Sequence, residues 1–137
     1  MSTIADTVES MLFRSDATFD QLDPTTWILN LDNRYSSQVI IKVEDPIVLF
    51  SLPIGVIGAQ VDNRETLYRT LLELNDDFLH NSYAINGSRL VLSAALQTEN
   101  LDANEFQAVI DDLTLNLDNH LEKLSNWKFD DSSTAEA

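Results

Sequence analysis

The chain of 137 residues is short enough for one domain, and its 44% hydrophobic content is sufficient for a core. It contains no cysteine, which excludes disulfides, thiolate metal sites and cysteine nucleophiles. Eight basic residues stand against 23 acidic ones, so the formal net charge of -15 would repel nucleic acid and anionic membranes and attract a basic partner. The same acidity could serve solubility alone.

The compartment is expected to be the cytoplasm. No apolar run approaches the roughly 18 to 20 residues that a membrane-spanning helix needs. The first residues, MSTIADTVESMLF, lack the basic start and the apolar block of a signal peptide. The absence of cysteine fits a reducing compartment.

The first half of the chain predicts one helix followed by three strands. Residues 3–13 carry apolar side chains at helical spacing, and Thr3 with Asp6 forms a start that resembles a capping box. Residues 15–24 break this pattern and are assigned no element. Alternating or wholly apolar runs then predict three strands, at 26–32, 38–44 and 47–52. Pro53 is expected to end the third strand.

Residues 54–60, with the sequence IGVIGAQ, are apolar although they lie between a strand and a helix. One interpretation is a buried connection, because isolated apolar residues beside glycines commonly pack inward. The other is a loop that contacts a partner through Ile54, Val56 and Ile57. The spacing of the two glycines also matches a phosphate-clamping loop, but its neighbours are apolar rather than basic.

A second helix and a β-hairpin are expected next. Residues 64–80 place apolar side chains at spacings of three and four, which is typical of a helix lying on a sheet. The dipeptide Asn86-Gly87 favours a two-residue type I′ turn between two strands. With that turn, Tyr83 would lie opposite Leu90.

The final helix has the clearest pattern in the sequence. Asp102 is a suitable N-cap, and apolar residues then recur at helical spacing as far as Leu124. Beyond it, Trp127 and Phe129 could fold back on the core. The organisation expected is therefore one domain over residues 1–129, with a disordered acidic tail at 130–137.

The candidates for chemistry are two adjacent aspartates and two histidines. Asp76 and Asp77 would point about 100° apart on a helix, so they cannot readily share a proton or bracket a scissile bond. His80 and His120 are each solitary in the sequence, and no metal, Walker, Rossmann or nucleophile-elbow motif is present. We therefore expect no enzyme, no metal and no cofactor.

An alternative function remains open at this point. A small acid/base or metal-dependent hydrolase would use Asp76, Asp77 and His80, and it would need those side chains to converge in one cleft. An acidic mimic of nucleic acid is less well supported, because the acidic residues are scattered over helix ends, turns and the tail.

One stretch carries a resemblance to a known family. Residues 71–113, LLELNDDFLHNSYAINGSRLVLSAALQTENLDANEFQAVIDDL, combine a helix ending in Leu-x-x-Asn, a strand, a tight turn, a second strand and a Leu-Asp helix start. This pattern resembles the type III secretion chaperone-like superfamily, especially its YbjN-like members. The resemblance implies an α+β fold with one antiparallel sheet and helices, in the order α-β-β-β-α-β-β-α.

The resemblance also implies a function without catalysis. Secretion-chaperone relatives are small, acidic and commonly homodimeric, and they hold an extended segment of a client protein. We therefore expect a chaperone-like or regulatory adaptor that binds a protein client or partner, with a basic partner favoured by the charge. A homodimer is expected, and neither nucleic acid nor membrane is expected as a partner.

Overall fold

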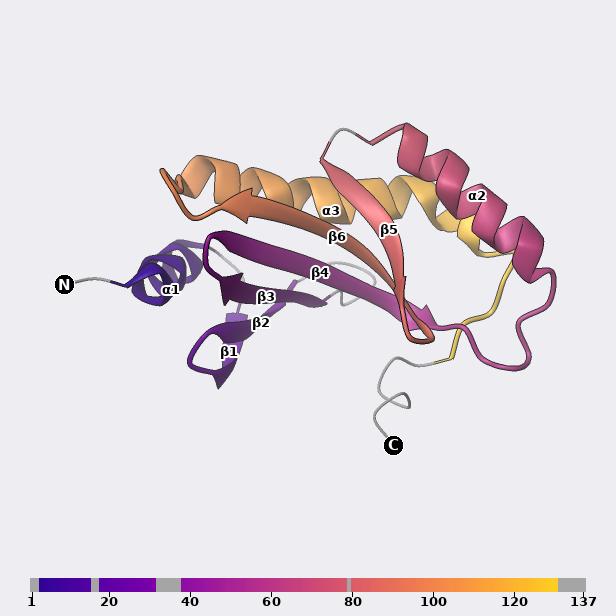
Figure 1. Ribbon diagram of the computed structural model, residues 1–137, viewed down its shortest axis with the longest axis horizontal. Coiled ribbons are helices and arrows are strands. Elements are labelled where there is room, and N and C mark those ends of the chain that lie inside the picture. Colours follow the sequence, from indigo (N-terminus) through magenta and orange to yellow (C-terminus); the bar gives the residue numbers. More distant parts are fainter. Residues whose placement is uncertain (1–2, 16–17, 32–37, 79, 131–137) are drawn as a thin grey trace.

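The computed structural model describes residues 3–15, 18–31, 38–78 and 80–130 (Figure 1). In chain order the helices and strands are α1 (Ile4–Arg14), β1 (Thr18–Asp23), β2 (Thr26–Asn30), β3 (Gln38–Glu44), β4 (Ile47–Val56), α2 (Arg64–Asp76), β5 (Asn81–Asn86), β6 (Arg89–Gln97) and α3 (Ala103–Leu124). The predicted α+β class and the order of helices and strands are confirmed, with β1 as an additional strand. None of the described helices is long and apolar enough to cross a membrane.

The sheet has six strands in the order β1-β2-β3-β4-β6-β5, and every neighbouring pair is antiparallel. The long strands β4 and β6 pair with each other in its interior. β1 and β5 form its two edges, which matters for function because an edge strand has backbone groups available for another chain. Figure 1 shows α3 running behind β6 and β5, with α2 beside the β5 edge.

The core fills the space between the sheet and the helices. Trp27, Ile41 and Phe50 lie opposite one another on successive strands and are almost wholly buried. Phe50 meets Phe106 of α3 edge to face, with ring centroids 5.2 Å apart. On the opposite face of the sheet, Ile28 and Ile40 are only half-buried. The sheet therefore has one packed face and one more open face, as is common in antiparallel sheets.

The starts of α1 and α3 follow the local sequence signals. Thr3 and Asp6 form the predicted capping box of α1, with both reciprocal hydrogen bonds present. Asp102 caps α3 by accepting hydrogen bonds from the backbone N–H groups of Asn104 and Glu105. In α1, Val8 and Leu12 are fully buried, so this short helix is held by its apolar face.

Two boundaries differ from the sequence prediction. Pro53 does not end its strand, because β4 continues to Val56 and the register shifts between Pro53 and Gly55. Such a bulge accommodates a residue that has no backbone N–H. The second helix ends at Asp76 instead of continuing to 80. The Asn75 side chain there binds the backbone of Tyr83.

The hairpin register was predicted incorrectly by two residues. Tyr83 pairs with Leu92, and Asn86 pairs with Arg89, so the turn is Gly87-Ser88 instead of Asn86-Gly87. Of these two turn residues, only Gly87 has a positive φ, of 65°, which is typical of a type II′ turn with glycine in its first position. A shift of two residues leaves each side chain on its predicted face.

The strand β1 had no signal of burial in the sequence. Of its six residues, only Phe19 is half-buried, and the others are exposed. β1 is held instead by its backbone pairing with β2, from Thr18 opposite Asn30 to Asp23 opposite Thr26. An edge strand of this kind lacks the apolar alternation by which strands are recognised.

The chain after α3 returns to the sheet. Trp127 and Phe129 are half-buried and pack against the core, as expected. Asp130 forms an isolated antiparallel bridge with Val56 at the end of β4. The remainder of the predicted acidic tail, residues 131–137, lies outside the described residues.

Candidate protein-binding surfaces

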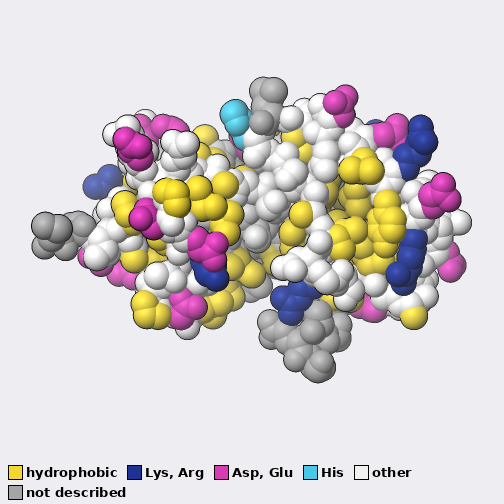
Figure 2. Space-filling view, in the orientation of Figure 1, with side chains coloured by type: hydrophobic (Ala, Val, Ile, Leu, Met, Phe, Trp, Pro, Cys, Tyr) yellow, Lys and Arg dark blue, Asp and Glu magenta, His cyan; other side chains and the backbone are white. Residues whose placement is uncertain are grey.

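An apolar groove separates α2 from the edge strand β5. It has a volume of about 230 Å³ and is lined by Tyr68, Leu71, Leu72, Asn75, Tyr83, Ala84 and Ile85. Leu72 is 70% exposed, and Tyr68 and Ile85 are also exposed. Figure 2 shows hydrophobic atoms gathered over α2 and β5, with basic side chains beside them. Exposed apolar residues clustered in this way are characteristic of an interaction site.

Asn75 determines how β5 can be approached. Its Oδ1 accepts a hydrogen bond of 2.7 Å from the backbone N–H of Tyr83, and its Nδ2 donates to the carbonyl oxygen of Tyr83 at 3.3 Å. The amide side chain thus occupies the backbone groups that a neighbouring strand would use at this position. This gives a structural role to the asparagine of the Leu-x-x-Asn pattern, and it favours contact with the groove through side chains.

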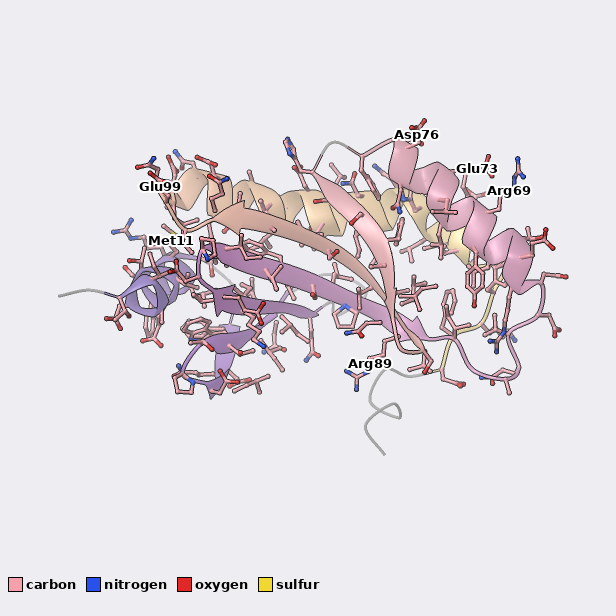
Figure 3. All side chains as sticks on the ribbon, in the orientation of Figure 1. Met11, Arg69, Glu73, Asp76, Arg89 and Glu99 are labelled. Carbon is pink, nitrogen blue, oxygen red and sulfur yellow. The ribbon has the colours of Figure 1, made fainter. Side chains whose placement is uncertain are left out.

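Charged residues of α2 lie outside the groove. Figure 3 shows Arg69, Glu73 and Asp76 projecting from the helix. The first two form an ion pair, with 3.5 Å between Arg69 Nε and Glu73 Oε1. Both side chains are largely exposed, so this pair contributes little to stability.

A second apolar surface lies at the opposite edge of the sheet, formed by the end of α1 and by β1. Phe13 is 73% exposed and packs edge to face on Phe19, with ring centroids 5.1 Å apart. Leu22 of β1 is 57% exposed. α1 and β1 together contain four acidic residues and one arginine, and Figure 2 shows acidic side chains interspersed with hydrophobic ones at this end. This α1–β1 edge is therefore both apolar and acidic.

The three residues of the hydrolase alternative do not form one site in the structure. Asp76 and Asp77 line an open cleft of about 790 Å³ between α2 and the end of α3, opposite Lys123. His80 is exposed and does not line this cleft. Among the described residues, no group of three or more His, Asp or Glu side chains could hold a metal ion.

A polar cluster that the sequence did not predict lies beside the groove. The Tyr83 hydroxyl and His120 Nδ1 are 2.8 Å apart, and the ring of Phe78 packs on both residues. Burial raises the pKa of Tyr83. Burial also lowers the pKa of His120, and Lys123 lowers it further, whereas Asp77 acts to raise it. The cluster fastens β5 to α3, and its only signal in the sequence was an isolated histidine beside the apolar stripe of a helix.

The residues proposed to contact a partner, Ile54, Val56 and Ile57, lie at and beyond the end of β4. Val56 and Ile57 are buried, with exposed fractions of 8% and 5%, and Ile54 is half-buried against the core. The chain between Trp127 and Asp130 lies beside them, with Phe129 close to Gly55 and Asp130 bridged to the backbone of Val56.

Comparison with known proteins supports the resemblance seen in the sequence. The family model CesT_Tir_1, of the type III secretion chaperone-like kind, matches residues 1–129. The crystal structure of YbjN from E. coli, a proposed transcription regulator, superposes with a TM-score of 0.65 at 16% identity and covers 85% of this chain and 89% of that chain. This second similarity concerns the fold alone. No curated protein matches the sequence.

Proposed function

Because the chain belongs to the CesT_Tir_1 family, we propose that it is a non-catalytic, chaperone-like module that holds a protein client or partner. The observation that carries this proposal is the position of its large exposed apolar side chains, which apart from Leu115 gather at the two edges of one sheet. Sheet edges commonly bind extended segments of other proteins, since backbone hydrogen bonds provide affinity and side-chain pockets provide specificity. The two edges differ in charge, and this difference assigns them different partners.

The α2–β5 groove suits a second copy of the chain. Residues 64–97 contain three arginines and four acidic residues, a net charge of -1, whereas the rest of the chain contains five basic and nineteen acidic residues, a net charge of -14. Two copies that meet at this face therefore join through their least acidic parts. The exposed side chains of Leu72 and Ile85 would form the apolar centre of a two-fold contact.

The α1–β1 edge suits the client. Its exposed apolar residues are Phe13 and Leu22, and β1 also carries the exposed acidic residues Asp20 and Asp23. An extended client segment with alternating apolar and basic residues would match this surface, because β1 has only one neighbouring strand, β2. Long-range attraction by the acidic surface would also speed the encounter with a basic client.

The overall charge and composition indicate the class of partner and the compartment. A net charge of -15 disfavours nucleic acid and anionic membranes as partners. We therefore propose a protein partner in the cytoplasm, a compartment that the cysteine-free sequence fits. Holding a protein segment requires no cofactor.

Sedimentation equilibrium tests the homodimer. The wild-type protein should sediment as a dimer at tens of micromolar, and raising the salt concentration should preserve or strengthen the dimer because screening weakens the repulsion between two acidic chains. Leu72→Lys should yield a monomer with an unchanged circular dichroism spectrum. The matched control is Leu115→Lys on α3, where the leucine is 58% exposed but lies outside the groove. A single species of 15.4 kDa for the wild type at both salt concentrations would refute the dimer.

Affinity capture from native lysate tests the client surface. One protein should be recovered with the wild type and with Leu115→Lys, and it should be lost with Leu22→Lys. Leu22 and Leu115 are exposed to 57% and 58%, so the two substitutions differ in position rather than in burial. Cross-linking should place a basic, extended client segment beside β1. Undiminished recovery with Leu22→Lys would exclude the α1–β1 edge as the client site.

A further inference from the structure

The segment Trp127–Asp130, here called the strap, lies on the end of β4. The backbone N–H of Val56 donates to the carbonyl oxygen of Asp130, and the N–H of Asp130 donates to the carbonyl oxygen of Val56, both at 3.0 Å. Trp127 and Phe129 are half-buried while Lys128 is exposed, which is the alternation of a β-strand. The strap thus occupies the position of a short additional strand.

Among the residues that the structure describes, the sheet leaves an open position at this point. β3 pairs with β4 only as far as Ile40 opposite Ser51. β4 continues to Val56 with β6 on one side, and on the other side its described pairing is with Asp130. Within the described part of the chain, the last residues of β4 therefore form a local edge inside the sheet order, and the strap covers the end of that edge.

Two of the three glycines in the sequence adapt this edge to the strap. A Cβ atom on Gly55 would lie 2.5 Å from the Cβ of Phe129, and a Cβ atom on Gly58 would overlap the carboxylate of Asp130. Neither glycine has the positive φ that only glycine adopts readily, in contrast to Gly87. What these two positions require is close approach of another chain segment.

Side chains add specificity to the contact. Gln60 Nε2 donates a hydrogen bond to Asp130 Oδ1, so the loop recognises a carboxylate. The adjacent position, beside Gly55, is occupied by the Phe129 ring. This surface therefore fits an extended segment in which an aromatic residue is followed by an aspartate. In this chain, Phe129 and Asp130 of the strap are such a pair.

We propose that the end of β4 and the glycine loop, residues 54–60, form a strand-docking site for an extended aromatic–aspartate segment of a partner protein, and that the strap occupies this site in cis until the partner displaces it. The backbone of the strap is joined to the sheet by a single bridge, whereas the core strands are held by continuous ladders, so detachment breaks only this bridge, the Gln60–Asp130 hydrogen bond and the packing of Trp127 and Phe129 and leaves the sheet folded. This site goes beyond the proposed function, because it is separate from both the α2–β5 groove and the α1–β1 edge. It also unites the two interpretations of residues 54–60, since three of these residues are buried and the stretch binds a segment of its own chain.

Hydrogen exchange in the wild-type protein tests whether the strap opens. The amide of Val56 should exchange through a local opening that does not depend on denaturant, while the amide of Phe50 in the middle of β4 should exchange only through global unfolding. If the two amides exchange through the same global event, the strap is a permanent part of the sheet and the proposal is overturned.

A peptide tests whether the site accepts a segment in trans. The capped tetrapeptide Trp-Lys-Phe-Asp should bind full-length Phe129→Ala at least about tenfold more tightly than it binds the wild type, because the tethered wild-type strap competes at a high effective concentration. The matched control variant is Lys128→Ala, which alters an exposed strap residue and should behave as the wild type. Amide shifts in the nuclear magnetic resonance spectrum should be confined to residues near 54–60. Adding Gly58→Ala to Phe129→Ala should abolish them, as should replacing phenylalanine by alanine in the peptide.

Several results would refute the proposal. Equal affinity of the peptide for the wild type, Lys128→Ala and Phe129→Ala would show that the strap is not a displaceable occupant. The absence of binding to a folded Phe129→Ala variant at millimolar peptide would show the same. If Phe129→Ala fails to fold, the hydrogen-exchange result on the wild type decides the question alone. If Phe129→Ala instead converts a wild-type dimer to a monomer, the site takes the strap of a second copy, and the separate partner is excluded.

Discussion

The Tyr83 hydroxyl and the Nδ1 atom of His120 lie 2.8 Å apart and join the edge strand β5 to α3. The pKa of Tyr83 is raised by burial, so its hydroxyl stays protonated, and the tautomer of His120 sets which of the two groups donates the hydrogen bond. The ring of Phe78 packs on both residues, with centroid distances of 5.5 Å and 5.3 Å. The backbone of Tyr83 is in turn held by Asn75 of α2, so this contact stabilises one wall of the α2–β5 groove.

The pH dependence of stability should reveal this contact. Burial and Lys123 lower the pKa of His120 in the folded protein below its ordinary value of 6.5, with Asp77 opposing the shift. Below about pH 6.5 the unfolded chain therefore takes up a proton before the folded chain does, and stability is lost as the pH falls through the lowered pKa. Urea midpoints at pH 8 and pH 5 should differ more for the wild type than for His120→Gln. An identical pH dependence of stability in both proteins would show that His120 does not cause the loss of stability at low pH.

The double variant Asp76→Asn, Asp77→Asn should fold normally. Both side chains are exposed, and Asp76 lies at the C-terminal end of α2, where negative charge is unfavourable by a few tenths of a kcal/mol. Because Asp77 acts to raise the pKa of His120, the variant should show that pKa shifted further down in a nuclear magnetic resonance titration. Asp76→Asn alone is the matched control. Loss of a metal bound at micromolar affinity, or a severe loss of stability, would instead support a functional carboxylate site.

Leu113→Ala should destabilise the protein by about 2 to 5 kcal/mol, since it removes a wholly buried side chain and leaves a cavity. Leu115→Ala, two residues along the same helix but 58% exposed, should cost far less. Urea unfolding of both variants measures the difference. A Leu113→Ala midpoint close to that of the wild type would show that α3 is not packed on the sheet as described.

Gly58→Ala should be destabilising by about 1 to 3 kcal/mol, because the new methyl group overlaps the Asp130 carboxylate. In an Asp130→Ala background the same substitution should cost less, because the overlap with the carboxylate is gone, only the contact with Gln60 Oε1 at 2.8 Å remains, and alanine restricts the unfolded chain. Chemical denaturation of the two single variants and the double variant measures this coupling. Additive effects would mean that the strap does not lie against Gly58.

Most helices and strands of the fold were predictable because their signals are local. The capping box at Thr3 and Asp6 and the cap at Asp102 involve residues two or three positions apart, and both are present in the structure. The apolar alternation of the central strands depends only on the two-residue repeat of a strand. At the candidate sites, the asparagine at position 75 was already part of the family pattern, although its bond to Tyr83 was not foreseen.

The amino-acid sequence by itself determined most of the elements, the caps of α1 and α3, the acidic composition and the family resemblance, since each depends on composition or on residues close together in the chain. Only the tertiary structure decided which distant groups meet. Tyr83 and His120 are 37 residues apart, and Gln60 and Asp130 are 70 residues apart. The path of the backbone sets such contacts, and no local periodicity encodes them. For the same reason the edge strand β1, the hairpin register and the strap on β4 followed from pairing between segments rather than from the pattern within any one of them.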